Sequence, residues 1–537
     1  MRGTMMDYPL TLIHILERAG KIFPRSEIVS RLADRSLRRC TYADFYRRAR
    51  ALAEALQRAG LRRGDRVATL MWNHYAHLEA YFGIPACGGV TQTLNLRLAP
   101  HDLAYIAKHA GGRFLILDDI LLPVYEKFRQ SVNFERVIVV PLSGHPAPAG
   151  YESYEDFLKT ASGNFSYPEL EETDAASMCY TSGTTGAPKG VVYTHRSVVL
   201  HSMLLSMADN FAISHNDVLL PAVSMFHVNG WGLPFAGAMV GCKLVLPGPC
   251  LDAESLLDLF ASEQVTVAAG VPTIWLSILE CLEQNSGRWK LNPMRALVGG
   301  AAPPLALIRK LDHHGIRIQQ GWGLTESSPE ATTSPLKSYM KDWTQEEKYA
   351  VTAKAGLAVP FVDLRVVNET GEVPGDGTTM GEIQLRGPWV AASYYNLPEE
   401  KEKWTNDGWF RTGDVGTIDA DGYLKIADRS KDLIKSGGEW ISSVDLENAL
   451  VAHPDVREAA VIAVFHPKWQ ERPLAVIVPR DGVTLDPRQL REFLVPRFAK
   501  WQLPDAFVFV DELPHTSTGK LHKLELRRRY QGWEWKG

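Results

Sequence analysis

Residues 180–190 read YTSGTTGAPKG, and this stretch decides how the rest of the chain is interpreted. Its glycines let backbone N–H groups approach a ligand closely, and its hydroxyls and Lys189 add donors and positive charge. Apolar runs flank it at Ala175 to Cys179 and at Val191 to Tyr193, so we expect two strands joined by the loop. A cradle for a polyanion is therefore a better interpretation than a flexible surface loop. The GxxxxGK[ST] pattern of another phosphate-binding loop fails, because Gly190 follows Lys189.

Length and composition exclude several classes of protein. A prior of ~150 residues per domain suggests two to four domains for 537 residues. The formal net charge of -4 leaves no basic footprint for nucleic acid. Six scattered cysteines without a CxxC pair predict reduced thiols in the cytoplasm and no zinc framework. No apolar leader is visible at the start of the sequence, and glycines and prolines interrupt Pro221 to Cys242, so we expect no secretory signal and no membrane span.

Alternating helix and strand patterns predict an α/β protein with parallel sheets. Tyr42 to Ala59 has helical spacing and stops at Gly60, Arg66 to Met71 resembles a buried strand, and the alternation continues to about residue 298. Short β segments from Gly356 to Tyr395 indicate a small distorted barrel, with a hairpin turn at Asp419 to Gly422. A charged stretch beginning at Asp428 marks a boundary. We expect a large N-terminal domain of 1–427, a hinge of 428–433, and a small mobile α+β domain of 434–537, whose Pro487 to Lys500 is helical.

Several clusters carry candidate chemistry. Gly299-Gly300-Ala301 follows an expected strand and would let a flat ring lie against the backbone, although an ordinary turn explains it equally well. Residues 320–326, QGWGLTE, offer an aromatic face and a carboxylate, Glu326, suited to magnesium. Taken alone, an aromatic between glycines such as Trp322 is more often a packing residue. We therefore weigh these clusters together rather than singly.

Charged residues further along the chain are weaker signals. Asp414 ends a β segment where a carboxylate could accept both hydroxyls of a ribose, but the same pattern is a common turn. Arg429, Lys431 and Lys435 bracket the predicted boundary, either as cations for an anionic ligand or as a solvated linker. Lys520 lies on a loop near the C-terminus, where a lone lysine is normally unremarkable. None of these residues identifies a site by itself.

Together and in this order, the motifs resemble the adenylate-forming superfamily of acyl-CoA synthetases, nonribosomal adenylation domains and luciferases. The resemblance runs from Tyr180 to Lys520, and earlier residues fit only in their alternating pattern of helices and strands. It implies that Thr181 and Glu326 lie near Mg2+. It further implies that the β- and γ-phosphates of ATP are held by a loop comprising Thr181, Ser182, Gly183, Thr184, Thr185, Gly186 and Lys189.

The same resemblance implies the remaining site. Trp322 stands in the adenine slot where the family more often has Tyr, Thr325 lies near the α-phosphate, and Lys520 bridges the acyl carboxylate and that phosphate. Lys431, Lys435 and Trp440 also approach the adenylate, and Asp428 is the hinge; Lys435 and Glu439 count among the catalytic candidates. The adenine slot also includes Gly299, Gly300, Ala301, Gln320 and Gly321. Asp414 and Arg429 would hold the ribose, and the pantetheine tunnel would be lined by Gly437, Gly438 and Glu439.

The implied reaction joins a carboxylic acid to AMP, releases pyrophosphate, and transfers the acyl group to CoA, with ATP, Mg2+ and CoA required. His227, Val228 and Trp231 should face the acid. Residues 226–231 contain no carboxylate, which argues against an amino-acid substrate. Val223 and Phe235 suggest that the pocket is apolar, with Trp231 a possible gate, although core packing explains these residues equally well. A homodimer is also expected from the family.

The acid stays open between a short- to medium-chain fatty acid and 3-methylmercaptopropionate, with a long-chain fatty acid as the alternative. The chain resembles the bacterial medium- and long-chain fatty acyl-CoA synthetases and the 3-methylmercaptopropionate:CoA ligases, and one methylene changes binding by only ~1 kcal/mol. Two other functions compete: a phosphoryl transferase using the glycine-rich loop, and a catalytically silent binding module. Products separate them, since AMP and pyrophosphate support the ligase and ADP supports the transferase.

Overall fold

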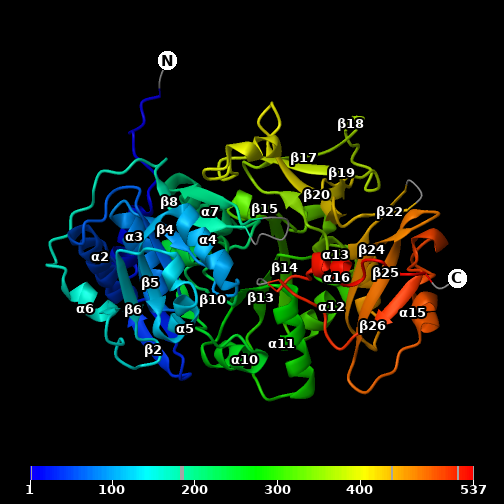
Figure 1. Ribbon diagram of the computed structural model, residues 1–537, viewed down its shortest axis with the longest axis horizontal. Coiled ribbons are helices and arrows are strands. Elements are labelled where there is room, and N and C mark those ends of the chain that lie inside the picture. Colours follow the sequence, from blue (N-terminus) through cyan, green and yellow to red (C-terminus); the bar gives the residue numbers. More distant parts are fainter. Residues whose placement is uncertain (2, 182–186, 437–438, 517–518, 536–537) are drawn as a thin grey trace.

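A computed structural model describes residues 1, 3–181, 187–436, 439–516 and 519–535, and does not describe the side chain of Glu439. Figure 1 shows two large sheets with their helices at the left and centre, a smaller sheet above, and the C-terminal lobe at the right. The expected Ser182, Gly183, Thr184, Thr185, Gly186, Gly437 and Gly438 lie outside the described residues.

The first sheet has seven strands in the order β7-β6-β5-β3-β4-β8-β9, all parallel except the last pair. Its central strands are almost entirely buried, as expected for strands covered on both faces. The bounds are β3 Arg66–Leu70, β4 Val90–Thr93, β5 Gly112–Asp118, β6 Arg136–Val140, β7 Glu152–Ser153, β8 Ala175–Tyr180 and β9 Gly190–Thr194.

The second sheet has nine strands, in the order β16-β15-β14-β13-β12-β10-β11-β1-β2, with antiparallel pairs only at its two edges. The predicted α/β alternation with parallel sheets is therefore confirmed. The bounds are β1 Glu27–Arg31, β2 Leu37–Thr41, β10 Val218–Pro221, β11 Lys243–Leu246, β12 Val267–Gly270, β13 Met294–Val298, β14 Ile316–Gly323, β15 Glu330–Thr333 and β16 Leu357–Ala358.

Helices cover both sheets, and the largest core lies between them. That core unites side chains of β3, β5, β10 and β11 with α3, every residue of which is buried. The predicted helix after Thr41 forms as α2, capped by the Thr41 hydroxyl, which accepts from the Asp44 N–H at 3.2 Å. The helices are α1 Leu12–Ile22, α2 Tyr42–Arg58, α3 Tyr75–Ala86, α4 Pro100–Ala110, α5 Leu122–Glu126, α6 Tyr154–Lys159, α7 His195–Leu205, α8 Val228–Trp231, α9 Leu233–Val240, α10 Ala253–Ser262, α11 Pro272–Gln284, α12 Leu305–His313 and α13 Gln345–Thr352.

The expected barrel takes the form of a five-stranded antiparallel sheet in the order β18-β17-β19-β20-β21. An isolated bridge between Gly356 and Leu424 links it to the segment before β16. The predicted turn at Asp419 is present, with the Gly422 N–H donating to the Asp419 carbonyl at 2.9 Å. The bounds are β17 Asp363–Asn368, β18 Gly371–Glu372, β19 Gly381–Arg386, β20 Phe410–Ile418 and β21 Leu424–Arg429.

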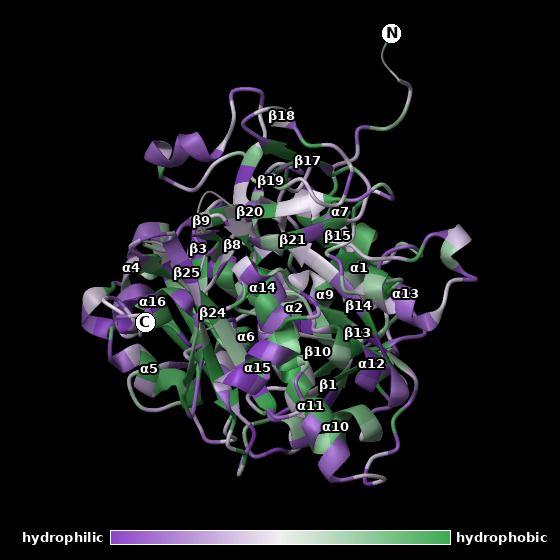
Figure 2. Ribbon diagram, turned by 90° about the vertical axis from the view of Figure 1, so that its right-hand side faces the viewer, coloured by the Kyte–Doolittle hydropathy of each residue, from purple (hydrophilic) through white to green (hydrophobic). Residues whose placement is uncertain are grey.

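The C-terminal lobe is a sheet in the order β23-β22-β25-β24, with β26 pairing with β25. Figure 2 shows its strands in the hydrophobic colour and its covering helices with hydrophilic faces. One helix is shorter than predicted. It ends at Leu494 rather than Lys500, because Pro496 has no N–H for the helical ladder and its ring clashes with the preceding turn. The bounds are β22 Ile434–Ser436, β23 Glu439–Ile441, β24 Val456–His466, β25 Gln470–Pro479, β26 Ala506–Phe509, α14 Ser443–Val451, α15 Pro487–Leu494 and α16 Lys523–Arg529.

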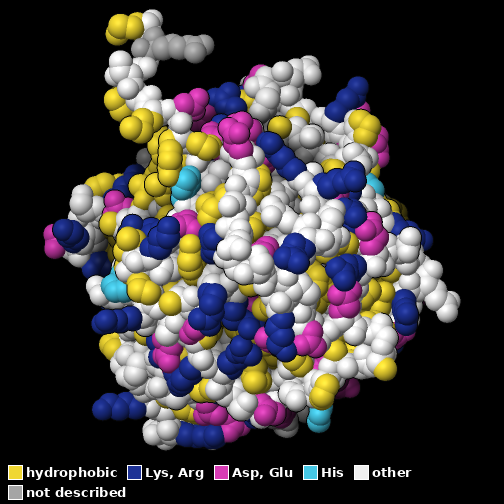
Figure 3. All heavy atoms as spheres, turned by 90° about the vertical axis from the view of Figure 1, so that its left-hand side faces the viewer, with side chains coloured by type: hydrophobic (Ala, Val, Ile, Leu, Met, Phe, Trp, Pro, Cys, Tyr) yellow, Lys and Arg dark blue, Asp and Glu magenta, His cyan; other side chains and the backbone are white. Residues whose placement is uncertain are grey.

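The surface is mixed in charge. On the face in Figure 3, basic and acidic side chains are interspersed, and apolar side chains gather on the projecting N-terminal arm, where Met5, Met6 and Tyr8 are exposed. Among the described residues, no helix combines the length and apolarity needed to cross a bilayer.

Candidate active site

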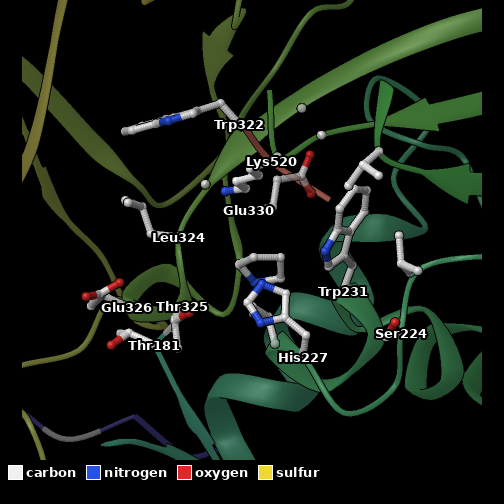
Figure 4. Close-up of a pocket in the computed structure, with 18 of the residues that line it drawn as sticks. Thr181, Ser224, His227, Trp231, Trp322, Leu324, Thr325, Glu326, Glu330 and Lys520 are labelled. Carbon is white, nitrogen blue, oxygen red and sulfur yellow. The ribbon is translucent and has the colours of Figure 1, made fainter. Parts of the chain in front are cut away.

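The candidate site is a cavity of about 310 Å³ where the large domain meets the C-terminal lobe. Strands of the second sheet run toward it, since the segments after β13 and at the end of β14 line it. Ligands of open α/β sheets bind outside the carboxyl ends of the strands, so the placement follows from the topology. In Figure 4, Thr181, Thr325 and Glu326 lie together at one end of the cavity, Trp231 and Glu330 lie toward the other, and His227 and Lys520 lie between.

Thr181 and Lys189 form the base of the glycine-rich loop. The Thr181 N–H donates to the Lys189 carbonyl at 2.9 Å, and the Thr181 hydroxyl accepts from the Lys189 N–H at 3.0 Å. The Lys189 ammonium lies 2.5 Å from a Glu400 carboxylate oxygen and 5.3 Å from the centre of the Tyr394 ring. Both residues line the cavity, and their contact with phosphates stays a prediction.

Glu326 and Thr325 are held in a single 3₁₀ turn that follows β14. The Glu326 carboxylate accepts from the Tyr394 hydroxyl, and its carbonyl accepts from the Ala391 N–H at 2.7 Å. The Thr325 carbonyl accepts from the Tyr193 hydroxyl at 2.7 Å. These bonds come from β9 and from the loop before β20, so neighbouring elements fix the direction of the carboxylate toward the cavity.

Trp322, Asp414 and Arg429 form one connected group. The Trp322 indole N–H donates to Asp414 Oδ2 at 3.1 Å, and Arg429 Nε lies 2.8 Å from Asp414 Oδ1. Asp414 faces Arg429 across the β20–β21 pair, and the carboxylate charge is the main reason that the pKa of Arg429 is raised. The sequence placed these residues in one nucleotide site, and the structure brings them into contact.

Glycines give the cavity its floor. At Gly299 an added Cβ would lie 3.1 Å from the Trp231 ring, and at Gly300, with φ at +84°, it would lie 3.3 Å from Lys520 Cε. Gly300 therefore permits a close approach that another residue would obstruct. Ala301, Gly321 and Gln320 line an adjoining cavity of about 390 Å³ between the two lobes.

Gln320 has a structural partner as well. With its amide oriented to donate, the nitrogen lies 3.1, 3.0 and 3.1 Å from the carbonyls of Thr352, Ala353 and Lys354. Its side chain therefore anchors the end of α13 against β14, while its place in the adenine slot stays a prediction.

Among the described residues, Lys520 is the only lysine of the C-terminal lobe that lines the first cavity. The pKa of Lys520 is lowered to about 8, mainly by burial and then by the Arg429 charge, while the Asp414 and Glu326 charges oppose this shift. The neighbouring His227 is kept neutral, because burial and the Lys520 charge lower its pKa to about 3. The site thus presents one titratable cation beside an uncharged imidazole.

The segment expected to face the acid forms a left-handed turn. Val228, Asn229 and Trp231 have φ of 42°, 42° and 56°, a conformation that costs a non-glycine residue roughly 1–2 kcal/mol. Asn229 anchors the turn to β8, since its amide donates to the Ser177 hydroxyl and its carbonyl oxygen accepts from Cys179 Sγ at 3.0 Å. The turn holds Trp231 against Gly299, and His227, Val228 and Trp231 all line the cavity.

Two other predictions for the acyl segment need qualification. Val223 lines the cavity, but Phe235 belongs to the core between the sheets, where its ring stacks on Tyr81 with centroids 5.1 Å apart. The segment lacks a carboxylate, yet Glu330 of β15 lines the same cavity. The pocket therefore does contain a carboxyl group, which the segment alone did not reveal.

Several predicted residues lie outside the first cavity. Lys431 lines the second cavity, and burial lowers its pKa. Lys435 and Trp440 pair with each other on the exposed β22–β23 hairpin, with the ammonium 5.4 Å from the ring centre, and line neither cavity. Roles for these residues and for Glu439 stay predictions.

Asp428, the predicted hinge, is the penultimate residue of β21. Its carboxylate accepts from the Arg429 N–H at 2.8 Å and from the Ser443 N–H at 3.1 Å, and Lys523 lies 3.9 Å away. The residue therefore joins the last strand of the large domain to α14 of the C-terminal lobe.

Sequence reasoning missed residues that reach the cavity from distant elements. Tyr394 supports Glu326 and Glu400 pairs with Lys189, although each is separated from its partner by a long stretch of chain. No local motif marks them, and only the packing of the loop before β20 brings them in. Others lining the cavity are Arg97, Ser224, Glu330 and Lys403.

Magnesium has a suitable ligand here. Glu326 offers an oxygen ligand at the cavity wall, and Mg2+ is typically bound by one or two carboxylates together with substrate phosphates and water. No cluster of three or more His, Cys, Asp or Glu side chains that could hold a metal occurs within the residues that the structure describes. The residues thus fit an ion that arrives with a nucleotide.

Comparisons with known proteins agree with this geometry. Residues 16–395 match the model of the AMP-binding enzymes, and residues 445–520 match the model of their C-terminal domain. A long-chain-fatty-acid–CoA ligase of Thermus thermophilus is 50% identical over 99% of this chain and 97% of its own length. A 3-methylmercaptopropionyl-CoA ligase of Ruegeria pomeroyi is 43% identical over 99% of both chains. The crystal structure of an anthranilate CoA ligase with anthranoyl-AMP has a TM-score of 0.87 at 26% identity, covering 98% of this chain and 99% of the other.

Proposed function

We propose how this chain works from the premise that it belongs to the AMP-binding enzyme family and, within it, to the AMP-forming acyl-CoA ligases. It joins an aliphatic carboxylic acid to AMP with release of pyrophosphate and then passes the acyl group to CoA. The observation that carries the proposal is the convergence of Lys520 from one lobe with Thr181 and Glu326 from the other in one cavity.

The nucleotide is bound by residues of the large domain. Trp322 would pack against adenine while its indole N–H steadies Asp414, whose carboxylate would accept hydrogen bonds from the ribose hydroxyls. Thr181 and Lys189 would donate to the phosphates, which requires Lys189 to exchange Glu400 for phosphate oxygens. Mg2+, held by Glu326 and the phosphates, would supply positive charge against the developing negative charge.

Lys520 would act in the first half-reaction. The acid's carboxylate attacks the α-phosphorus of ATP, so two anions must approach each other in line. A protonated Lys520 lying between them offsets their repulsion by several kcal/mol in a site sheltered from water. The neutral His227 beside it adds no competing charge.

The second half-reaction needs no protein nucleophile, because the mixed anhydride is itself a good electrophile for the CoA thiol. We propose that the C-terminal lobe turns about residues 428–433 between the two steps. The second cavity lies between the lobes and provides space near the adenylate. Gly437, Gly438 and Glu439 would then line the pantetheine path.

The acid is proposed to be aliphatic. The acyl end of the cavity is lined by apolar side chains, which include Leu205, Phe211, Val223, Val228, Trp231 and Val298. Relatives named for long-chain fatty acids and for 3-methylmercaptopropionate bracket the candidates. Action in the cytoplasm and a homodimeric state remain part of the proposal from the sequence.

Product analysis tests this function. The purified protein is incubated with ATP, Mg2+, CoA and acids from butyrate to palmitate, together with 3-methylmercaptopropionate. Acid-dependent formation of AMP, pyrophosphate and a CoA thioester is expected. Formation of ADP would instead identify a phosphoryl transferase, and the absence of any acid-dependent ATP–pyrophosphate exchange would identify a silent binding module.

A further inference from the structure

Glu330 is an unusual residue at the acyl end of the cavity. It is the first residue of β15, faces Gly323 of β14, and is 4% exposed. Its backbone is held on both sides: the N–H donates to His201 Nε2 at 3.3 Å, and the carbonyl accepts from the Trp389 indole N–H at 2.9 Å. The side chain therefore leaves a fixed point of the sheet and lines the cavity.

The Glu330 carboxyl group is only half satisfied. Oε2 accepts from the Asn210 amide at 3.1 Å, whereas Oε1 is buried without a hydrogen-bond partner among the described residues. Nor does an ion pair with Glu330 occur among them, and the nearby His201 is neutral because burial lowers its pKa to about 3. Burial raises the pKa of Glu330 to about 8, so at neutral pH it is mainly protonated.

Gly321 lies beside the unpartnered Oε1 of Glu330. At Gly321 an added Cβ would lie 3.6 Å from Glu330 Oε1 and 3.1 Å from the Phe211 ring. Because Oε2 accepts from Asn210, the proton of the neutral carboxyl belongs on the buried, unpartnered Oε1. Trp231 lines the same cavity and stands beside Glu330 in Figure 4.

We infer that Glu330 is a specificity-determining residue, and that the preferred acid carries a hydroxyl group at the end remote from its carboxylate. This inference rests on the proposed ligase function and deepens it. A hydroxyl can accept from a protonated Oε1 and donate to an ionised one, so it satisfies the carboxyl in either state. A plain methyl terminus would leave a buried polar group without a partner, which selects against it.

Acids of matched length test the inference. Over a range of chain lengths, kcat/KM for pyrophosphate release is measured with unsubstituted, terminally hydroxylated and terminally aminated acids. In the wild type, the hydroxylated acid of the best length should exceed its unsubstituted counterpart by about tenfold. E330L should reverse this ratio by at least about tenfold, and E330Q, which keeps hydrogen-bonding capacity, should retain a preference for the hydroxyl.

E54Q is the matched control. Glu54 is also buried, but its carboxylate accepts from the N–H groups of Ser162 at 2.8 Å and Gly163 at 3.0 Å, and it lines neither cavity. Its hydroxyl-to-alkyl ratio should equal that of the wild type. Circular dichroism confirms folding, and E330M, which also removes the hydrogen-bonding group, carries the test if E330L fails to fold.

Three results would overturn the inference: a wild-type preference for unsubstituted acids at every length, an unchanged ratio in both E330L and E330Q, or a preference for the aminated acids. In each of these cases AMP and pyrophosphate still form, so the ligase function stands. If no acid yields AMP, the proposed function fails instead.

Discussion

Replacing Lys520 with alanine separates the two half-reactions. The residue contributes the ammonium that lies with Thr181 and Glu326 in the cavity, and removing one preorganised donor from such a site costs about 10²–10³ in rate. Acid-dependent ATP–pyrophosphate exchange should fall by that factor in K520A. Thioester formation from supplied acyl-AMP and CoA should change by less than about threefold, because it does not use this contact.

The pH dependence gives the same test a quantitative form. The pKa of Lys520 is lowered to about 8, and a base with a lowered pKa loses its proton as the pH rises through that value. Roughly nine tenths of the molecules carry the charge at pH 7 and roughly one tenth at pH 9, so kcat/KM for adenylation should fall about tenfold between these pH values. K520R should abolish this alkaline fall, because a guanidinium stays charged, even if its rate is lower.

K500A is the control for these measurements. Lys500 is an exposed lysine of the same lobe and lines neither cavity, so both half-reactions and the pH profile should match the wild type. Equal loss of both half-reactions in K520A would refute the assigned role. So would a wild-type profile that stays flat up to pH 10 or an alkaline fall that persists in K520R.

Three further substitutions follow from contacts of the site. W322F keeps an aromatic ring but removes the 3.1 Å bond to Asp414, so the Kd for ATP measured by calorimetry should rise by about tenfold; an unchanged Kd would show that Asp414 needs no such support. G300A places a methyl group 3.3 Å from Lys520 Cε at a φ of +84°, so pyrophosphate exchange should fall more than ATP affinity; equal losses would contradict this. R480A removes the 3.1 Å ion pair with Glu280, which is exposed and worth at most about 1 kcal/mol, so the midpoint of thermal unfolding should stay within about 2 °C. The ratio of the two half-reaction rates should shift, and E280Q should reproduce that shift. A ratio unchanged in both variants would exclude the pair from control of the lobe.

The sequence predicted the fold because its signals are local and periodic. Tyr42 to Arg58 repeats apolar residues at helical spacing, and the buried strands are short apolar runs, so neither depends on distant partners. The predicted end of α15 was wrong. The helical spacing of apolar residues continues past Pro496, but the ladder of backbone hydrogen bonds cannot continue through a proline.

The site was predictable only where its residues belong to contiguous motifs. Trp322, Asp414 and Arg429 stand in such motifs, and the structure brings them into contact. Tyr394 and Glu330 were missed because their roles arise from loop packing and strand register, which have no local signal. The same limitation applied to the argument that the acyl pocket has no carboxylate, since the carboxyl comes from a different strand.

The way in which the two lobes adhere supports a rotation between the half-reactions. Among the described residues, no hydrophobic cluster includes members from both sides of 428–433. The lobes instead meet through polar contacts such as Lys425 with Asp445 at 2.9 Å and Arg480 with Glu280 at 3.1 Å. Exposed pairs of this kind exchange readily for water, so beyond the buried hydrogen bonds at Ala427 and Asp428 turning the lobe costs little free energy, whereas separating a shared apolar core would be costly. In this orientation Lys520 lies in the cavity and the Lys435–Trp440 pair is exposed, so a rotation that exchanged these two faces would account for both sets of predicted residues.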